Sequence, residues 1–269
     1  MNSDTKKPKI SIVIPAYECH QVIYKMVSLV LHSLTSLKLP FEIVVVIDGK
    51  DESLFREVKR IKSKNIKIIY YEKNKGKGFA VKLGMEYSTG DYIGYIDAGL
   101  DISVNSLYLA IKEIIKNDTD IVCGSKKHPN SYIENYTILR RILTFGYNML
   151  ARILLGINYV DTQVGLKVYS KRLLKDVLPR LLVKRFAFEV EMLAVAELFG
   201  YNHHIDIPVK ISFKDKSHAA TIHSIMQMIL DTVAVFYRLR ILKYYQKNNE
   251  LVFLERYAKG YDECEIYFG

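Results

Sequence analysis

Short apolar segments alternate with amphipathic segments along the first half of the chain, and this alternation constrains the fold more than any other feature. The apolar segments are rich in β-branched residues and too short for helices, whereas the segments between them repeat apolar residues at helical spacing. Strands that are apolar throughout and separated by helices favour an α/β fold with a mostly parallel sheet covered on both faces. The predicted strands are 9–14, 41–47, 66–71, 92–96 and 120–123, and the predicted helices are 20–37, 54–61, 74–87 and 104–115.

The bulk properties of the chain favour an anionic partner in a reducing compartment. The 269 residues carry a formal net charge of +10, which suits nucleic acid, a membrane surface or a phosphorylated substrate. Cys19, Cys123 and Cys264 are far apart and lack metal-ligand spacing, so we expect reduced thiols and a cytoplasmic location. Residues 1–9 lack the apolar run of a secretory signal, and no uncharged stretch reaches the ~18 residues of a membrane-spanning helix.

An acidic pair follows the predicted strand 92–96. Asp97 stands where this strand ends, which is where open α/β sheets bind ligands, and Asp101 follows shortly after it. Two carboxylates this close repel each other unless a cation or a group of donors separates them, and oxygen ligands of this kind suit Mg²⁺ or Mn²⁺. The alternative interpretation is a turn aspartate followed by an aspartate that caps a helix.

Two further predicted strands end in acidic residues, Glu18 and Asp48. Parallel strands end at one edge of a sheet, so we expect these side chains and Asp97 to line a single acidic crevice suited to a nucleotide. Asp48 with Gly49, considered alone, is equally typical of an ordinary turn. Residues 74–78 contain glycines and two lysines before a helix, an arrangement that fits neither a Walker A loop nor a dinucleotide fingerprint but could bind an anion.

The second half of the chain contains two basic amphipathic segments. Segment 134–156 places arginines among large apolar residues, which suits a ligand with a charged head and an apolar tail, or a core helix with a solvated basic face. Segment 221–245 ends in basic and tyrosine residues, as membrane-interface helices do, although a core helix or a dimer helix is an alternative. Glu189 and Glu191 should face different ways on a helix over 186–199, one in the site and one in solvent.

We expect a catalytic domain over 8–215 and an amphipathic helix over 216–245. The remaining tail, 246–269, has no predicted role. Segment 202–213 is predicted to be a strand, and Pro208 favours an edge position for it.

The motifs in this order resemble family 2 glycosyltransferases with the GT-A fold, and within them the polyprenyl-phosphate (dolichyl-phosphate) hexose synthases. The resemblance runs from about residue 10 to residue 240. The matching pieces are Val13-Ile14-Pro15-Ala16-Tyr17-Glu18, Asp48-Gly49, Asn74-Lys75-Gly76-Lys77-Gly78, Gly90-Asp91, Asp161-Thr162-Gln163-Val164-Gly165-Leu166-Lys167 and Phe188-Glu189-Val190-Glu191.

The resemblance implies a nucleotide-binding side and a metal. Asp97 would be the first acid of the family's Asp-X-Asp metal motif, but Gly99 replaces the second acid. We therefore expect Asp97 and Asp101 to share Mg²⁺ or Mn²⁺. The residues implied to hold the nucleotide or lie near it are Pro15, Tyr17, Glu18, Asp48 and Lys77.

The resemblance also implies an acceptor side. Ser125 and Lys126 match the family's Ser-Arg, and Arg140 and Thr144 match residues that grip a lipid phosphate. Gln163 and Glu189 would border the sugar and the acceptor. An acceptor phosphate is already an anion near neutral pH, so positioning and charge neutralisation would carry most of the catalysis, with Glu189 as the base if one is needed.

The implied activity is inverting transfer of a hexose from a nucleotide sugar to a polyprenyl phosphate at the cytoplasmic face of a membrane. The Asp-Thr-Gln-X-Gly-Leu-Lys motif is similar to that of dolichyl-phosphate glucose synthases, which favours UDP-glucose over GDP-mannose as donor. A catalytically lapsed nucleotide-binding member of the fold is the alternative that Gly99 suggests. Nucleic-acid binding has no support beyond the net charge, so we expect no nucleic-acid partner.

Overall fold

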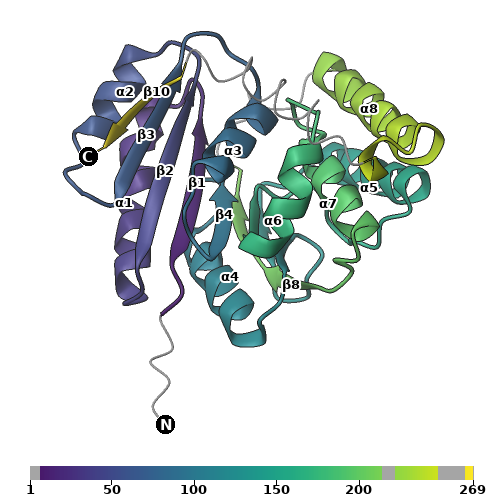
Figure 1. Ribbon diagram of the computed structural model, residues 1–269, viewed down its shortest axis with the longest axis horizontal. Helices are drawn as coiled ribbons and strands as arrows, with labels where there is room; N and C mark the ends of the chain where they lie inside the picture. Colours follow the sequence, from purple (N-terminus) through teal and green to yellow (C-terminus); the bar gives the residue numbers. More distant parts are fainter. Residues whose placement is uncertain (1–6, 214–221, 248–263, 269) are drawn as a thin grey trace.

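An eight-stranded sheet forms the centre of the molecule in the computed structural model, which describes residues 7–213, 222–247 and 264–268 (Figure 1). The strand order is β10-β3-β2-β1-β4-β7-β5-β8. The strands are β1 (Ile10–Ala16), β2 (Phe41–Asp48), β3 (Ile66–Tyr71), β4 (Tyr92–Ile96), β5 (Ile121–Ser125), β7 (Leu166–Ser170), β8 (His204–Pro208) and β10 (Glu265–Phe268).

The prediction of a mostly parallel sheet is confirmed. β3, β2, β1 and β4 run parallel to one another, and β5 runs parallel to β8. β7 is antiparallel to both of its neighbours, and β10 is antiparallel to β3. Because β7 is reversed, it begins at the edge where β4 and β5 end. The loop that precedes β7 therefore lies at the same edge as Asp97. The reversal of β7 was not predicted from the sequence.

Helices cover both faces of the sheet (Figure 1). Alternate residues of each strand point to opposite faces, so Ile12 and Ile14 join the core under α1, α2 and α4, whereas Val13 joins the core under α3, α6 and α7. The helices are α1 (His20–Ser36), α2 (Glu52–Lys59), α3 (Lys77–Glu86), α4 (Val104–Asn117), α5 (Ile138–Leu155), α6 (Lys171–Val177), α7 (Phe188–Leu198) and α8 (Ile222–Phe236).

The segment predicted as one strand over 202–213 is two strands. β8 lies at the sheet edge, as Pro208 suggested, and β9 (Lys210–Ser212) leaves the main sheet to pair with β6 (Tyr132–Glu134). Proline has no N–H for a ladder bond, so the pairing changes at this point. β9 also bridges to Ile102, which brings it beside the loop after β4.

The C-terminal segment packs back onto the domain. α8 contacts α5 and α7, and a turn of π-helix (Tyr237–Ile241) and a short 3₁₀ helix (Tyr244–Gln246) follow it, so the predicted helix over 221–245 is interrupted. Residues 216–221 of the predicted helical segment and 248–263 of the predicted tail lie outside the described residues. In the parts of the chain that the structure describes, no helix has the length and apolarity needed to cross a bilayer. The tail returns to the far edge of the sheet as β10.

Candidate active site

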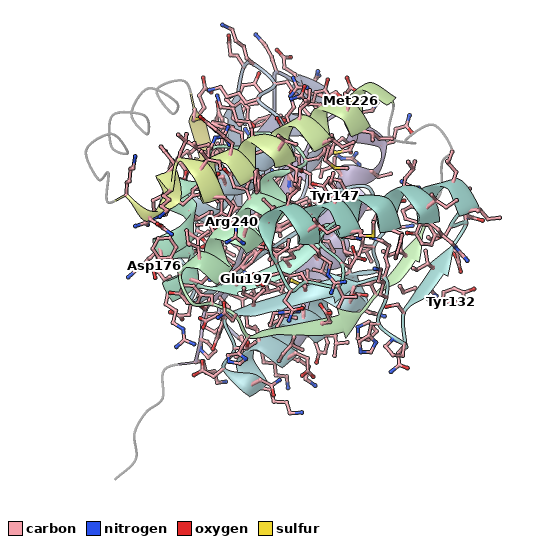
Figure 2. All side chains as sticks on the ribbon, turned by 90° about the vertical axis from the view of Figure 1, so that its right-hand side faces the viewer. Tyr132, Tyr147, Asp176, Glu197, Met226 and Arg240 are labelled. Carbon is pink, nitrogen blue, oxygen red and sulfur yellow. The ribbon has the colours of Figure 1, made fainter. Side chains whose placement is uncertain are left out.

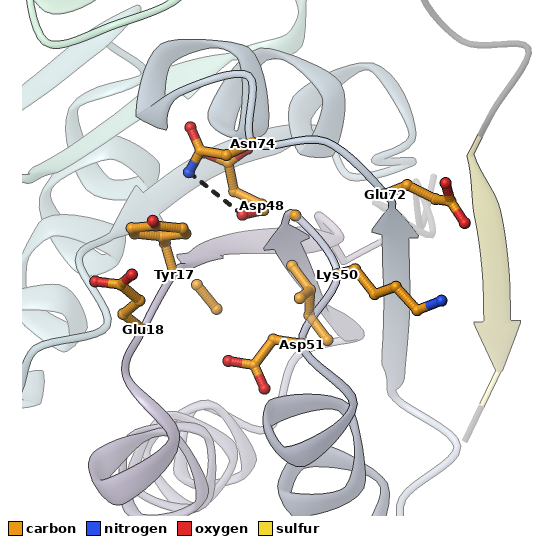
Figure 3. A pocket seen from close by; sticks show the side chains of 10 residues that line it. Tyr17, Glu18, Asp48, Lys50, Asp51, Glu72 and Asn74 are labelled. Carbon is orange, nitrogen blue, oxygen red and sulfur yellow. Dashed lines mark hydrogen bonds between the residues drawn. The ribbon is translucent and has the colours of Figure 1, made fainter.

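A pocket of about 350 Å³ opens where β1 and β2 end (Figure 3). Tyr17 and Glu18 follow β1, Asp48 ends β2, and Asn74 lies in the loop before α3. The structure thus brings three of the predicted nucleotide-binding residues into one pocket. Pro15 lies within β1, one residue before the part of the strand that lines the pocket.

The carboxylate of Asp48 shapes the loop that leads to α3. It accepts hydrogen bonds from the hydroxyl of Tyr71 (2.9 Å) and from the backbone N–H groups of Lys75 (2.7 Å) and Gly76 (2.9 Å). Gly76 has a φ of +99°, which favours glycine, and a Cβ there would lie 2.6 Å from the carbonyl oxygen of Lys184. Asp48 therefore holds the start of α3 in place, and its carboxylate is buried by these contacts.

Four charged side chains of alternating sign lie in a row beside this pocket, and we call them the charge chain: Asp97, Lys77, Glu189 and Lys167. Nζ of Lys77 lies 2.8 Å from Oδ1 of Asp97 and 2.8 Å from Oε1 of Glu189. Nζ of Lys167 lies 3.3 Å from Oε2 of Glu189. The exposed fraction of the side chain rises along the row, from 0% at Lys167 and 3% at Glu189 to 18% at Lys77 and 42% at Asp97. The row thus leads from the protein interior to the sheet edge.

Asp97 rests against the backbone of the loop before β7. Its N–H donates to the carbonyl oxygen of Gly165 (3.0 Å), and a Cβ on Gly165 would lie 1.9 Å from Oδ2 of Asp97. Oδ1 is shielded from solvent although part of the side chain is exposed. This loss of water, together with the charge of Glu189, raises the pKa of Asp97 despite Lys77. Gly165 was quoted in a motif but was not predicted as a site residue.

The five residues from Asp97 to Asp101 form a tight turn that carries the two carboxylates predicted to bind a metal. Leu100 has a left-handed φ of 60°, which costs a residue with a side chain about 1–2 kcal/mol. A Cβ on Gly99 would lie 3.7 Å from Oδ2 of Asp101, so this carboxylate lies over the glycine that replaces the second acid. Oxygen donors of this kind suit Mg²⁺ or Mn²⁺.

The protein offers few further ligands at this turn. Within the described ranges, no group of three or more His, Cys, Asp or Glu side chains could hold a metal ion. Mg²⁺ is usually bound through one or two carboxylates, with water and substrate phosphates completing its shell. Asp97 and Asp101 therefore fit a cation that is bound together with a diphosphate.

Glu189 is a poor candidate for a base in this environment. Burial raises its pKa, but the ammonium groups of Lys167 and Lys77 outweigh burial and the pKa is lowered. A carboxylate held ionised by two cations accepts a proton weakly, which favours a role in balancing charge. In the same way, burial lowers the pKa of Lys77, but Asp97 and Glu189 outweigh it and raise that pKa.

Lys167 is the site residue that the sequence reasoning missed most clearly. Its ammonium is fully buried and donates to the carbonyl oxygens of Thr162 (3.1 Å) and Val164 (2.8 Å), besides its contact with Glu189. It therefore ties α7 to the loop that carries Gly165. A lysine inside an otherwise apolar strand was the available signal, since an unpaired buried charge would be costly.

Lys126, predicted to grip the acceptor, is engaged within the protein. Its ammonium lies 3.0 Å from Oδ2 of Asp161, and its backbone N–H donates to the same oxygen (2.9 Å). Burial raises the pKa of Asp161, but Lys126 outweighs burial and the pKa is lowered. Ser125 is also buried. Asp161 and Gly165 belong to one loop, so Lys126 and Asp97 lie on the same side of the molecule, and acceptor roles for Ser125 and Lys126 stay predictions.

Arg140 lies closer to the acidic turn than the sequence distance suggests. Its guanidinium carbon is 3.8 Å from the ring centroid of Phe213. The residue before this ring, Ser212, donates its N–H to the carbonyl oxygen of Asp101 (2.9 Å). Thr144 follows Arg140 by one helical turn on α5, so both are on one side of this helix. Gln163 lies in the loop before β7 and donates its N–H to Asp161 (3.1 Å).

Both glutamates at the start of α7 are buried, so the expectation that one of them is solvated is wrong. Glu191 accepts hydrogen bonds from the N–H of Val183 (2.8 Å), the N–H of Leu182 (3.0 Å) and the hydroxyl of Tyr245 (2.6 Å). Burial raises the pKa of Glu191. These contacts fasten the segment after α8 to the loop before α7.

Helices α5 and α8 run beside each other (Figure 2). The exposed side chains of these two helices are largely apolar. Tyr147 and Thr232 share a buried hydrogen bond of 2.9 Å between the two helices. Only one side of α5 is buried, so Ile138 keeps 76% and Ile153 keeps 70% of its surface exposed. We call this surface the apolar face, and its members are Ile138, Leu139, Ile142, Leu143, Phe145, Met149 and Ile153 of α5 with Met226, Leu230 and Val233 of α8.

Residues 11–178 match the family described as glycosyl transferase family 2. The chain is 29% identical over 243 residues to a dolichyl-phosphate beta-glucosyltransferase of Dictyostelium discoideum, with 85% of this chain and 74% of that protein covered. A human protein of the same name is 28% identical over 211 residues, with 73% of this chain and 65% of that protein covered. The chain thus spans somewhat less than two thirds of the human relative.

Solved structures with the same fold include two synthases. Glucosyl-3-phosphoglycerate synthase from Mycobacterium tuberculosis, crystallised with Mn²⁺, UDP and glucosyl-3-phosphoglycerate, superposes with a TM-score of 0.59 at 17% identity, covering 86% of this chain and 79% of that chain. Mannosyl-3-phosphoglycerate synthase from Rubrobacter xylanophilus superposes with a TM-score of 0.63 at 16% identity, covering 90% of this chain and 77% of that chain. At these identities the likeness shows the fold, which agrees with the predicted GT-A class.

Proposed function

The chain belongs to glycosyltransferase family 2, and from this premise we propose that it moves glucose from UDP-glucose to a polyprenyl (dolichyl) phosphate with inversion at the sugar carbon. The observation that carries the proposal is the position of Asp97 and Lys77 beside the strand-end pocket. Asn74 lines this pocket and Lys77, three residues later, contacts Asp97. A nucleotide in the pocket would therefore direct its diphosphate toward this pair.

The donor side combines a proposed cation site with the ammonium group of Lys77. A divalent cation held by Asp97 and Asp101 would offset the charge that develops on the departing diphosphate. Lys77 is kept protonated by its two carboxylate neighbours and reaches the same region. Glu189 contacts Lys77 from the interior side, and Lys167 contacts Glu189 in turn.

On the acceptor side, Arg140 is the basic group best placed to bind a phosphate. Guanidinium groups bind phosphate through a planar fork of donors, and Phe213 supports the plane of Arg140 from one side. The ammonium of Lys126 lies at the same edge and is paired with Asp161, which belongs to the loop that carries Gly165. A phosphate monoester attacks as an anion, so the reaction needs positioning and charge neutralisation more than a base.

The apolar face supports a lipid acceptor at a membrane surface. Monomeric soluble proteins seldom expose a continuous apolar surface of this kind, and such surfaces mark interaction sites. Arg140 lies on the helix that contributes most of this face. Arg141 and Arg152 are exposed on the same helix, and basic side chains beside an apolar surface favour anionic lipid. We place the enzyme at the cytoplasmic face of a membrane, where the apolar face would contact the lipid that carries the phosphate.

The choice of UDP-glucose rests on the relatives and on the Asp161 to Lys167 motif. The relatives named above are dolichyl-phosphate beta-glucosyltransferases, and one structural neighbour was crystallised with UDP. A screen of radiolabelled UDP- and GDP-sugars with polyprenyl phosphate and Mg²⁺ or Mn²⁺ tests this choice. We expect label in the lipid fraction from UDP-glucose, whereas label from GDP-mannose would make the protein a mannose synthase.

Gly99 favours a second candidate, a nucleotide-binding protein of this fold that no longer transfers sugar. It predicts that calorimetry detects UDP binding in the presence of Mn²⁺ while transfer stays at background for every donor. The screen and the calorimetry together separate the two candidates, because only the enzyme shows both binding and turnover.

A further inference from the structure

Lys77 occupies the face of Asp97 that a divalent cation would need. Its ammonium lies 2.8 Å from Oδ1 and 3.0 Å from Oδ2, so it contacts both oxygens of the carboxylate. A metal ion bound by the same oxygens would be repelled by an ammonium group at this distance. The cation and Lys77 therefore compete for one carboxylate.

Lys77 is the cationic member of the charge chain with the more exposed side chain, 18% against 0% for Lys167. Lys167 is fully buried and held by two carbonyl oxygens, and Glu189 is almost fully buried between the two lysines. Asp97 is confined by Gly165. Lys77 begins α3, keeps a partly exposed side chain and has the long flexible stem of a lysine. The ammonium of Lys77 would keep its contact with Glu189 after leaving Asp97.

We propose that Lys77 is a resident counter-ion of Asp97, which metal binding displaces toward the donor diphosphate. This inference rests on the proposed function, since it takes the incoming anion to be the diphosphate of a nucleotide. In the free enzyme Lys77 neutralises Asp97 and keeps its affinity for a metal low. When nucleotide and metal bind together, the diphosphate supplies the negative charge that Lys77 then pairs with. The donor and the metal therefore bind cooperatively.

Metal binding without nucleotide tests this competition directly. We would titrate Mn²⁺ into the wild type and Lys77→Met, with free Mn²⁺ measured by electron paramagnetic resonance, and repeat the titration with UDP present. We expect Lys77→Met to bind Mn²⁺ roughly 10-fold more tightly than the wild type without UDP, and UDP to tighten Mn²⁺ binding less in the variant. Lys112→Met removes the same charge from an exposed position on α4 and should match the wild type. Equal or weaker Mn²⁺ binding by Lys77→Met would overturn the proposal.

A second measurement uses the wild type and does not depend on the variant folding. Reductive methylation of lysines, quantified by mass spectrometry, reports how accessible the Lys77 ammonium is. We expect labelling of Lys77 to increase several-fold with Mn²⁺ alone and to fall again when UDP is added, while labelling of Lys112 stays constant. Labelling of Lys77 that is unaffected by Mn²⁺ refutes displacement. Neither measurement involves sugar transfer, so failure of the displacement and failure of the proposed transfer are distinguished by separate assays.

Discussion

The carboxylate of Asp97 occupies the space that a side chain at Gly165 would need. A Cβ on Gly165 would lie 1.9 Å from Oδ2 and 2.2 Å from Cγ of Asp97. The backbone at Gly165 is thus the surface against which Asp97 is positioned. Lys167, two residues later, anchors this loop through the carbonyl oxygens of Thr162 and Val164. The position of the Asp97 carboxylate therefore depends on a loop that lies far from Asp97 in the sequence.

Gly165→Ala should displace Asp97 and impair transfer without unfolding the protein. A displacement of about 1 Å can lower a rate roughly 100-fold, so we expect kcat to fall by about this factor. Steady-state kinetics and circular dichroism would be measured together. Gly146→Ala is the matched change at a helix position where a Cβ meets nothing within 4 Å, and its melting temperature should be equal or higher. Wild-type kcat in Gly165→Ala would contradict the positioning of Asp97 by this glycine.

Removing one member of the buried pair Lys167 and Glu189 should destabilise the protein strongly. Lys167→Met leaves Glu189 with Lys77 alone, and breaking a buried ion pair costs roughly 3–5 kcal/mol. Adding Glu189→Gln removes the uncompensated charge. The double variant should therefore lose less free energy of unfolding than the two single variants lose in total. Urea denaturation of the four proteins measures this coupling. Strictly additive losses would mean that the two side chains do not interact.

The ion pair of Asp161 with Lys126 should make stability depend on pH in acid. The pKa of Asp161 is lowered in the folded state, so its contribution is present above the unfolded pKa of about 3.9 and is lost as pH falls through the folded pKa. Asp161→Asn should therefore be about 2 kcal/mol less stable than the wild type at pH 7. Denaturation between pH 7 and pH 3 should show that the difference in free energy of unfolding between the wild type and Asp161→Asn narrows only below about pH 4. A gap that stays constant down to pH 3 would argue against the pair.

Polar substitutions on the apolar face should weaken membrane binding and spare nucleotide binding. Burying one isoleucine side chain contributes roughly 1.5–3 kcal/mol, so Ile142→Asn with Ile153→Asn should lower vesicle binding by at least about 100-fold. Flotation with anionic lipid vesicles measures the binding. Leu29→Asn alters an exposed apolar residue on α1, away from this face, and should bind as the wild type does. Unchanged binding by the double variant would remove the membrane from the proposal.

The strand ends around the pocket were predictable because the sequences of fully buried parallel strands are short, continuous apolar runs. β1 to β4 lie within two residues of their predicted bounds, and the rule that parallel strands end together grouped Glu18 with Asp48, which line one pocket. The reversed β7 was not predicted as a strand of this sheet, since Lys167 interrupts its apolar pattern.

The charge chain was not predictable from local patterns. Glu189 lies 112 residues from Lys77 in the sequence and 22 residues from Lys167, and such pairs form only once the helices pack on the sheet. Likewise, Lys126 looked like a free phosphate ligand because its partner, Asp161, is 35 residues away. Residue types revealed the chemistry of this site, and the fold decided which charges meet.

The most direct test compares the wild type with Asp97→Asn in a transfer reaction that contains UDP-[¹⁴C]glucose, polyprenyl phosphate and Mn²⁺. We predict that the wild type forms a lipid-linked β-glucosyl phosphate and that Asp97→Asn, which keeps the size of the side chain but loses its charge, is slower by at least about 1000-fold. Product from the wild type at background level, or equal rates for the two proteins, would contradict the role assigned to the sheet edge at Asp97.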